Sequence, residues 1–165
     1  MSGIFGMNIK MAIYGESHGK SIGVVLDGLP PGLALDEAAI AAEMARRAPG
    51  QNALSTARKE SDTVEIQSGF FNGFTTGTPL CARIVNSDQH SKDYSILADK
   101  MRPGHADYAG HVRYQGFNDY RGGGHFSGRI TAPLVAAGAI LARALEDRGI
   151  FIGTHILRAA GVEDR

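Results

Sequence analysis

Residues 120–131 read Tyr-Arg-Gly-Gly-Gly-His-Phe-Ser-Gly-Arg-Ile-Thr, a glycine-rich loop that carries two arginines and leads directly into an apolar stretch. Glycine has no Cβ, so consecutive glycines can turn several backbone N–H groups toward one point. A helix that begins just afterwards adds its unpaired N–H groups and the positive end of its dipole. Arg121 and Arg129 add forked donors that suit phosphate or carboxylate. The loop predicts an anion site or, equally well, a flexible turn, because it has neither the ending of a P-loop nor a complete dinucleotide motif.

The residues after this loop predict a helix over residues 131–147. Pro133 suits its first turn, and Gly149 suits the position just past its end. Few of its positions are polar, so we expect a helix that is buried on most sides. Its apolar residues include Leu134, Val135, Ala137, Ile140, Leu141 and Leu145. Residues 150–157 then predict another strand.

The residues before the loop predict antiparallel strands. Residues 9–14 and 21–27 read as strands, and the short connection between them favours a hairpin. Residues 63–67 and 80–86 alternate in the same way, and their glycine- and threonine-rich connection favours a second antiparallel pair.

One helix and two loops complete this part of the chain. Asp36 can cap a helix over residues 37–47, whose apolar stripe is Ile40, Ala41, Met44 and Ala45. Residues 51–62 have no periodicity and predict a mobile loop that carries Arg58 and Lys59. Residues 87–119 predict a second loop, and a loop of this length is usually functional or disordered.

The composition fits a soluble protein with one domain. The chain has 165 residues, of which 43% are hydrophobic, enough for one core of ordinary size. Basic and acidic residues balance, so the charge gives no argument for a nucleic acid or a membrane as partner. No apolar run is long enough to span a bilayer. The single cysteine, Cys81, fits a buried, inert thiol in a reducing cytoplasm.

Histidines in glycine-rich loops are the first candidates for chemistry. Glu16, Ser17 and His18 are adjacent, so they cannot all point to one centre as a hydrolytic triad. His18 lies between Ser17 and Gly19 and could donate or accept a proton near neutral pH. A solvent-facing turn histidine is the simpler alternative.

A metal site and an anion site are the other two candidates. His105, Asp107 and His111 could ligate a metal in a hydrolase, but their spacing matches no strong metal pattern and no cysteine supports it. Several arginines lie beside loops of proline, glycine and histidine, where a multiply anionic small molecule needs forked donors. Three of a set of six arginines have this position; the set is Arg46, Arg47, Arg102, Arg113, Arg121 and Arg129.

Five motifs in this order and spacing identify a family. They are Gly-Glu-Ser-His-Gly at 15–19, Val-Leu-Asp-Gly-Leu-Pro-Pro-Gly at 25–32, Arg-Arg-Ala-Pro-Gly at 46–50, Arg-Pro-Gly-His-Ala-Asp-Tyr at 102–108 and Asp-Tyr-Arg-Gly-Gly-Gly at 119–124. Together they resemble chorismate synthase, and the resemblance extends over the whole chain. It implies an α+β fold with helices sandwiched between antiparallel sheets, of which this chain would form the N-terminal portion.

The resemblance also implies an activity. Chorismate synthase is a lyase that converts 5-enolpyruvylshikimate 3-phosphate to chorismate and phosphate by an anti 1,4-elimination. The family requires reduced FMN, and NADPH only where a member reduces its own flavin. It implies a homotetramer, usual in the family. From the residues themselves we expect a cytoplasmic protein without a metal.

Site residues carry over by matching motif. His18 would be the acid near the leaving phosphate, and His105 would lie against the flavin. Arg47, Arg102 and Arg129 match positions that hold substrate anions. His125, Phe126 and Ser127 match a segment that contacts FMN.

This sequence departs from the family at several positions. Ala48 and Ala53 stand where many relatives have arginine, so the phosphate grip could use Arg58 or Lys59 instead. His125 replaces another arginine. Relatives are longer, and their C-terminal half carries more flavin contacts and an aspartate assigned to proton abstraction. We therefore expect these 165 residues alone to be inactive, and a non-catalytic anion-binding or assembly fragment is the alternative.

Overall fold

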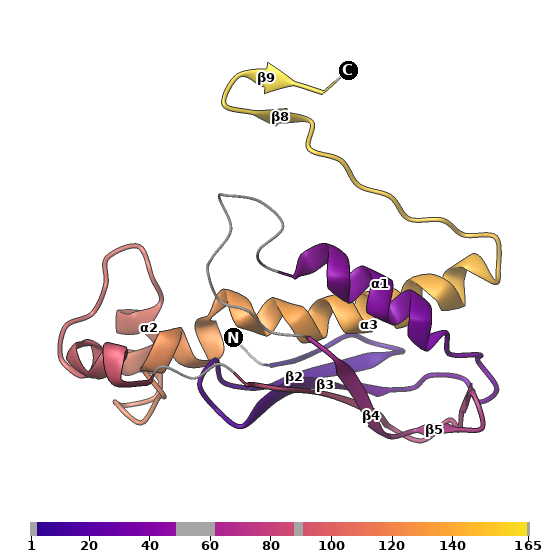
Figure 1. The fold of residues 1–165 in the computed structure, drawn as a ribbon, viewed down its shortest axis with the longest axis horizontal. Helices are drawn as coiled ribbons and strands as arrows, with labels where there is room; N and C mark the ends of the chain where they lie inside the picture. The colour runs from indigo at the N-terminus through magenta and orange to yellow at the C-terminus, as the bar shows by residue number, and fades with distance from the viewer. Residues whose placement is uncertain (1–2, 49–61, 88–90, 165) are drawn as a thin grey trace.

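The computed structural model describes residues 3–48, 62–87 and 91–164, and its centre is one antiparallel sheet (Figure 1). The strand order in this sheet is β1-β2-β3-β7-β4. The predicted hairpin is confirmed, since β2 pairs with β3 from Lys10 opposite Asp27 to Gly15 opposite Ile22. The second predicted pair, β4 with β7, is confirmed as well. The bounds are β1 Ile4–Phe5, β2 Lys10–Gly15, β3 Ser21–Asp27, β4 Val64–Ser68 and β7 Leu80–Val85.

Two helices cover one face of the sheet (Figure 1). They are α1, Glu37–Arg47, and α3, Thr131–Glu146, and they pack against each other. Alternate residues of β3 and β7 point toward them and are fully or almost fully buried: Ile22, Val24, Leu26, Leu80, Ala82 and Ile84. This alternation is the period of two that a half-buried strand requires, and it places the core between sheet and helices.

Helix α1 begins and ends where the sequence predicts. The Asp36 carboxylate accepts a hydrogen bond of 2.9 Å from the backbone N–H of Ala39, which satisfies a donor that the first helical turn leaves open. Of the predicted apolar stripe, Ile40 and Met44 are buried, whereas Ala41 and Ala45 face outward.

Helix α3 corrects two expectations. With the turn before it, it forms a 19-residue stretch, Gly128–Glu146, that by length and composition alone could cross a membrane. Its inner side packs on the sheet and on α1 instead, through Ala132, Pro133, Ala136, Ala137, Ile140 and Ala144. The helix is not buried on most sides, since Leu134 is 39% exposed on its outer side. Small residues on the inner side let the helix lie close to the sheet.

The fold class is α+β, as predicted. The described residues provide one large sheet on one side of the helices, together with two short ribbons. One ribbon, β5 Phe70–Phe71 with β6 Phe74–Thr75, lies within the predicted connection between β4 and β7. The other is β8 Arg158–Ala159 with β9 Val162–Glu163.

The predicted loop over residues 87–119 is wrong in part, because its described residues contain two helical segments. They are η1, a 3-10 helix over Ser91–Ala98, and α2, over Asp107–Arg113. The apolar residues in these segments are too few to produce a periodic signal, and both segments contact the glycine loop. Arg58 and Lys59 lie outside the described residues. Asp62, at the end of the predicted mobile loop, is fully buried.

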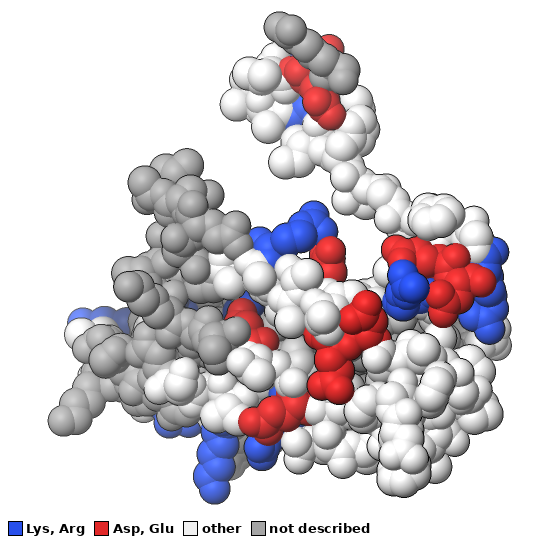
Figure 2. All heavy atoms as spheres, turned by 45° about the vertical axis from the view of Figure 1, so that its right-hand side comes forward, with Lys and Arg blue, Asp and Glu red and all other residues white. Residues whose placement is uncertain are grey.

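The predicted strand over residues 150–157 is also wrong. These residues run away from the helices as an extended arm without a strand assignment (Figure 1). A strand needs a neighbouring strand to satisfy its backbone groups, and no strand among the described residues pairs with this segment. The arm exposes Ile150, Phe151, Ile152, Ile156 and Leu157. On the visible face in Figure 2, acidic and basic residues are interspersed on the body from which the arm extends.

Cys81 is half-buried on the sheet face that the helices do not cover. Its sulfur lies 3.9 Å from the hydroxyl of Tyr14. The Tyr14 ring crosses Gly23, where a Cβ would lie 2.3 Å from that hydroxyl, so glycine is required at this position. Burial, followed by the contact with Cys81, raises the pKa of Tyr14 to about 12.

Candidate functional site

The three consecutive glycines form the floor of the site. Gly122, Gly123 and Gly124 have φ angles of 58°, 85° and 55°, a region that residues with a Cβ rarely adopt. A Cβ on Gly122 would lie 2.4 Å from the ring of His18, and one on Gly123 would lie 2.5 Å from the ring of His105. The two histidines that the sequence singles out therefore lie against neighbouring residues of one loop. This loop is the 3-10 segment η2, Arg121–Phe126.

His18 is held in a buried position on this floor. The backbone N–H of Ser17 donates to the carbonyl of Gly124 at 3.0 Å, which ties the histidine loop directly to the glycine loop. The imidazole is 5% exposed, and its ring meets Tyr94 edge-on at a centroid distance of 4.9 Å. His18 is thus not the solvent-facing turn histidine of the simpler alternative. A buried imidazole with a fixed orientation is suited to directed proton transfer.

Asp107 joins the second histidine to an arginine. Its carboxylate accepts from Nδ1 of His105 at 2.9 Å and from Nε and Nη2 of Arg102 at 2.8 and 2.9 Å. Since a carboxylate can only accept, Nδ1 of His105 carries the proton. The Arg102 side chain, with its backbone N–H, holds the pKa of Asp107 well below its usual range despite burial. The same hydrogen bonds raise the pKa of Arg102.

We expect the Asp107→Asn variant to be less stable than the wild type at pH 7, with a deficit that shrinks as the pH falls from about 4 toward 2. A carboxyl whose pKa is lowered by folding stabilises the fold above its unfolded-state pKa of about 3.9, and acid removes this stabilisation. Urea unfolding at several pH values measures the deficit. The matched control is Glu43→Gln, which breaks the exposed pair between Glu43 and Arg46 and should change the unfolding free energy by less than about 1 kcal/mol at any pH. A deficit for Asp107→Asn that is constant with pH would contradict the expectation.

Arg121, the first arginine of the glycine loop, is paired within its own loop. Its Nε and Nη2 donate to the Asp119 carboxylate at 2.8 and 2.6 Å, and its backbone N–H donates at 3.0 Å. Burial opposes the charge on Asp119, but these contacts outweigh it and lower its pKa. The sequence predicts that Arg121 binds the anion of a ligand, but its guanidinium is already paired with the Asp119 carboxylate.

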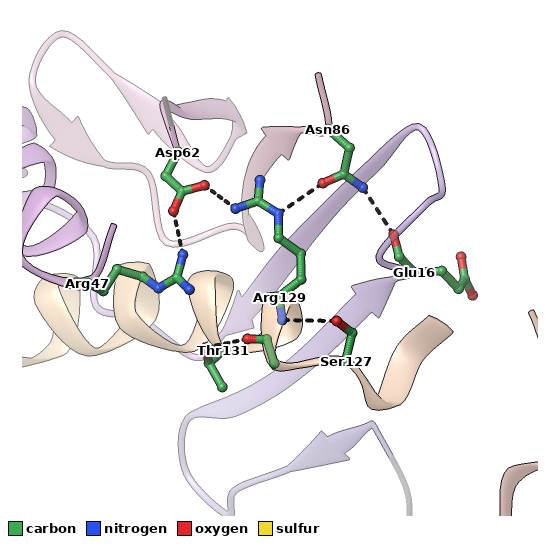
Figure 3. A network of polar contacts seen from close by, with 8 residues as sticks. Glu16, Arg47, Asp62, Asn86, Ser127, Arg129 and Thr131 are labelled. Carbon is green, nitrogen blue, oxygen red and sulfur yellow. Dashed lines mark hydrogen bonds and ion pairs between the residues drawn. The ribbon is translucent and has the colours of Figure 1, made fainter. Parts of the chain in front are cut away.

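The second arginine, Arg129, lies in a buried network (Figure 3). It belongs to the 3-10 turn η3, Gly128–Ile130, which Ser127 begins by accepting from the backbone N–H of Arg129 at 3.3 Å. Its Nη1 donates to Asp62, and Asp62 also accepts from Nη1 of Arg47. Two of the three arginines predicted to bind substrate anions are thus brought together. Arg102 is paired instead with Asp107, which also contacts His105.

Asn86 connects this network to the loop of His18 (Figure 3). Its Oδ1 accepts from Nε of Arg129 at 3.1 Å. Its Nδ2 donates to the carbonyls of Glu16 and Gly19, at 3.0 and 2.8 Å, which lie on either side of His18 in the sequence. The arginine network and the histidine loop are therefore one hydrogen-bonded unit.

The residues predicted to contact FMN lie next to an aromatic cavity. His125 and Phe126 line a cavity of about 370 Å³ together with Glu16, Tyr114, Phe117, Asn118 and Asp119. His125 is oriented by a 2.8 Å hydrogen bond between its Nδ1 and the carbonyl of Gly15. Phe126 packs on Gly110, where a Cβ would lie 2.7 Å from its ring. Ser127 is not among the lining residues; its hydroxyl serves the turn before α3.

The geometry gives no support to the metal alternative. In the part of the chain that the structure describes, no group of three or more His, Cys, Asp or Glu side chains could hold a metal ion. The Asp107 carboxylate contacts His105 but is already occupied by Arg102. His111 packs beside Gly116 instead.

Sequence reasoning missed three residues of this site. Asp62 ends a polar stretch without periodicity, Asn86 is the last residue of a predicted strand, and Tyr94 falls within a predicted loop. None of these positions has a local pattern that points to a site. Their contacts join segments far apart in the sequence, and such contacts can be found only from the tertiary structure.

Comparisons with known proteins agree on one family. The family model described as chorismate synthase matches residues 9–165. The chorismate synthase of Desulfovibrio desulfuricans is 51% identical over 158 residues, which cover 96% of this chain and 43% of that protein. The chorismate synthase of Lachnoclostridium phytofermentans is 54% identical over 151 residues, 92% of this chain and 41% of that protein.

A solved structure supports the same assignment. A crystal structure of a chorismate synthase superposes with a TM-score of 0.61 at 30% sequence identity, over 88% of this chain and 36% of that chain. This chain thus spans less than half the length of the proteins that it matches. The family model nevertheless covers almost every residue of it, and the chain belongs to the chorismate synthase family.

Proposed function

We propose that this chain supplies the histidine and arginine side of an active site that converts 5-enolpyruvylshikimate 3-phosphate to chorismate and phosphate. The observation that supports this proposal is the packing of His18 and His105 against Gly122 and Gly123. One histidine that can donate a proton and a second histidine lie on the same glycine loop, and arginines belong to the same site. This combination suits the loss of an anionic leaving group.

His18 is the proton donor in this proposal. Phosphate leaves poorly as a highly charged anion, so a proton and positive charge are needed where negative charge develops. The backbone N–H of Ser17 donates to the glycine loop, and Asn86 donates to two backbone carbonyls of the His18 loop. These hydrogen bonds fix the backbone on both sides of the imidazole. The proton therefore leaves from a defined position.

The arginines bind the substrate anions. Arg102 is held through Asp107 beside His105, and Arg47 and Arg129 are held through Asp62. Arginine stays charged and offers several donors in one plane, which suits phosphate and carboxylate groups. Because each guanidinium is already oriented, little side-chain entropy would be lost on binding.

The aromatic cavity beside His125 and Phe126 fits part of a flavin. Tyr114 and Phe117 add further ring surfaces, which suit a flat aromatic group. Reduced FMN, when bound, would supply the electron density that helps to expel phosphate. His105, with its proton fixed on Nδ1, would stabilise the flavin's charge. NADPH is needed only if the full enzyme reduces its own flavin, and we propose a cytoplasmic homotetramer for it.

A chimera tests this function. Residues 1–165 are joined to the part of the Desulfovibrio desulfuricans relative that this chain does not match. We expect the chimera to form chorismate from 5-enolpyruvylshikimate 3-phosphate under anaerobic conditions with reduced FMN. The 165 residues alone should form none, because the matched region covers only 43% of that relative.

The intact relative serves as the positive control for substrate and flavin. A folded chimera that binds FMN but forms no chorismate would overturn the proposed function. Chorismate formation by the 165-residue chain alone would overturn the expectation that the site is incomplete.

A further inference from the structure

Asp62 combines three properties that rarely occur together at a structural position. It is not a glycine, yet its φ is 49°, in the left-handed region. Its side chain is 0% exposed, although an aspartate is seldom fully buried unless it is paired. The carboxylate lies between two guanidiniums, with Arg47 on one oxygen and Arg129 on the other (Figure 3).

The two arginines come from different parts of the fold. Arg47 is the last residue of α1, and Arg129 lies in the turn before α3. Their side chains are 19% and 5% exposed, so their mutual repulsion is weakly screened by water. Without an anion between them, two buried positive charges would separate. Asp62 therefore fixes how these guanidiniums are placed relative to each other.

The charge of this group favours an anion. Two arginines and one aspartate leave a net charge of one positive unit. Asn86 holds Arg129 from the other side through Nε, and it is itself tied to the loop of His18. The remaining positive charge is thus held at a fixed place next to the proposed proton donor.

We propose that Asp62 is a positioning residue that acts as an internal counter-anion, holding Arg47 and Arg129 in place for an incoming phosphate group. This inference rests on the proposed function, which gives these two arginines the substrate anion. In the absence of ligand, the Asp62 carboxylate keeps the two guanidiniums together, as a bound anion would.

The Asp62→Asn variant of the 165-residue chain tests this directly, since asparagine keeps the shape and removes the charge. We expect its melting temperature to fall by about 10 °C, because it leaves two buried guanidiniums without a counter-anion. Inorganic phosphate should then raise the melting temperature of Asp62→Asn several times more than that of the wild type. Sodium chloride at equal ionic strength should not, because general screening does not replace a specific anion.

Glu65→Gln is the matched control. Glu65 lies on β4, just after Asp62, and pairs with Arg83, but both side chains are more than 40% exposed. This variant should melt within about 2 °C of the wild type and respond to phosphate as the wild type does. A purely structural role for Asp62 would lower its melting temperature without any extra response to phosphate, and that result would overturn the proposal.

A double-mutant cycle keeps the test valid if Asp62→Asn unfolds. Adding Arg47→Gln to Asp62→Asn removes one of the two facing charges, so the double variant should be more stable than Asp62→Asn alone. A double variant that is no more stable than Asp62→Asn would overturn the proposal. None of these measurements requires turnover or flavin, so their failure is distinguishable from failure of the proposed function in the chimera.

Discussion

In the chimera, replacing His18 with alanine should lower turnover by about 100- to 10,000-fold, the range that a general acid contributes, while FMN affinity changes by less than about twofold. The structure separates these two effects. The His18 imidazole is 5% exposed and lies on Gly122, whereas the aromatic cavity is lined by His125 and Phe126. Losing the imidazole removes a proton donor without removing a wall of that cavity.

Anaerobic turnover with reduced FMN and flavin titration measure these two quantities separately. His155→Ala is the control, because His155 lies on the exposed arm with a side chain that is 69% exposed. The His155→Ala substitution should leave turnover and FMN affinity unchanged. Equal losses of turnover and flavin binding in His18→Ala would contradict the role of His18 as the acid on the phosphate side.

The second large effect is expected at the floor of the site, where Gly122→Ala should destabilise the chain by about 2–5 kcal/mol. Part of this cost comes from the backbone, since Gly122 has a φ of 58°. The rest comes from a steric overlap, because the new Cβ would lie 2.4 Å from a buried imidazole. His18 would have to move away from the glycine loop.

Gly128→Ala is the matched control from the same segment. No atom lies within 4 Å of a Cβ built there, so its unfolding free energy should change by less than about 0.5 kcal/mol. Urea unfolding of both variants measures the cost, and the NMR signals of His18 report its displacement. A Gly122→Ala chain as stable as Gly128→Ala would show that the position of His18 does not depend on a glycine at residue 122.

Local sequence predicts more of the sheet than of the site. The pairing of β2 with β3 follows from alternating residues and a short connection, and α1 begins at Asp36 because a carboxylate there can accept from the first turn. These are interactions between near neighbours. The arm at residues 150–157 has the same local appearance as a strand, but no strand beside it among the described residues, and so it forms none.

The arginines also have features that local sequence can predict and others that it cannot. Their positions beside glycine loops predict a site for anions, and in the structure Arg102 and His105 both contact the carboxylate of Asp107. The sequence could not reveal that Arg121 is paired by Asp119, or that Asp62 holds Arg47 and Arg129. A guanidinium on a loop looks the same in sequence whether its donors are taken or available.

The sequence by itself determined the family, the antiparallel strands, the two long helices and the glycine loop with its two histidines. Each of these depends on motifs or on periodicity along the chain. The tertiary structure decided which groups meet: His18 on Gly122, His105 on Gly123, and Asp62 between two arginines. The reason is physical, because burial and charge pairing depend on distances in space between residues that are far apart in the chain. Asp62, for example, lies 15 positions from Arg47 and 67 positions from Arg129.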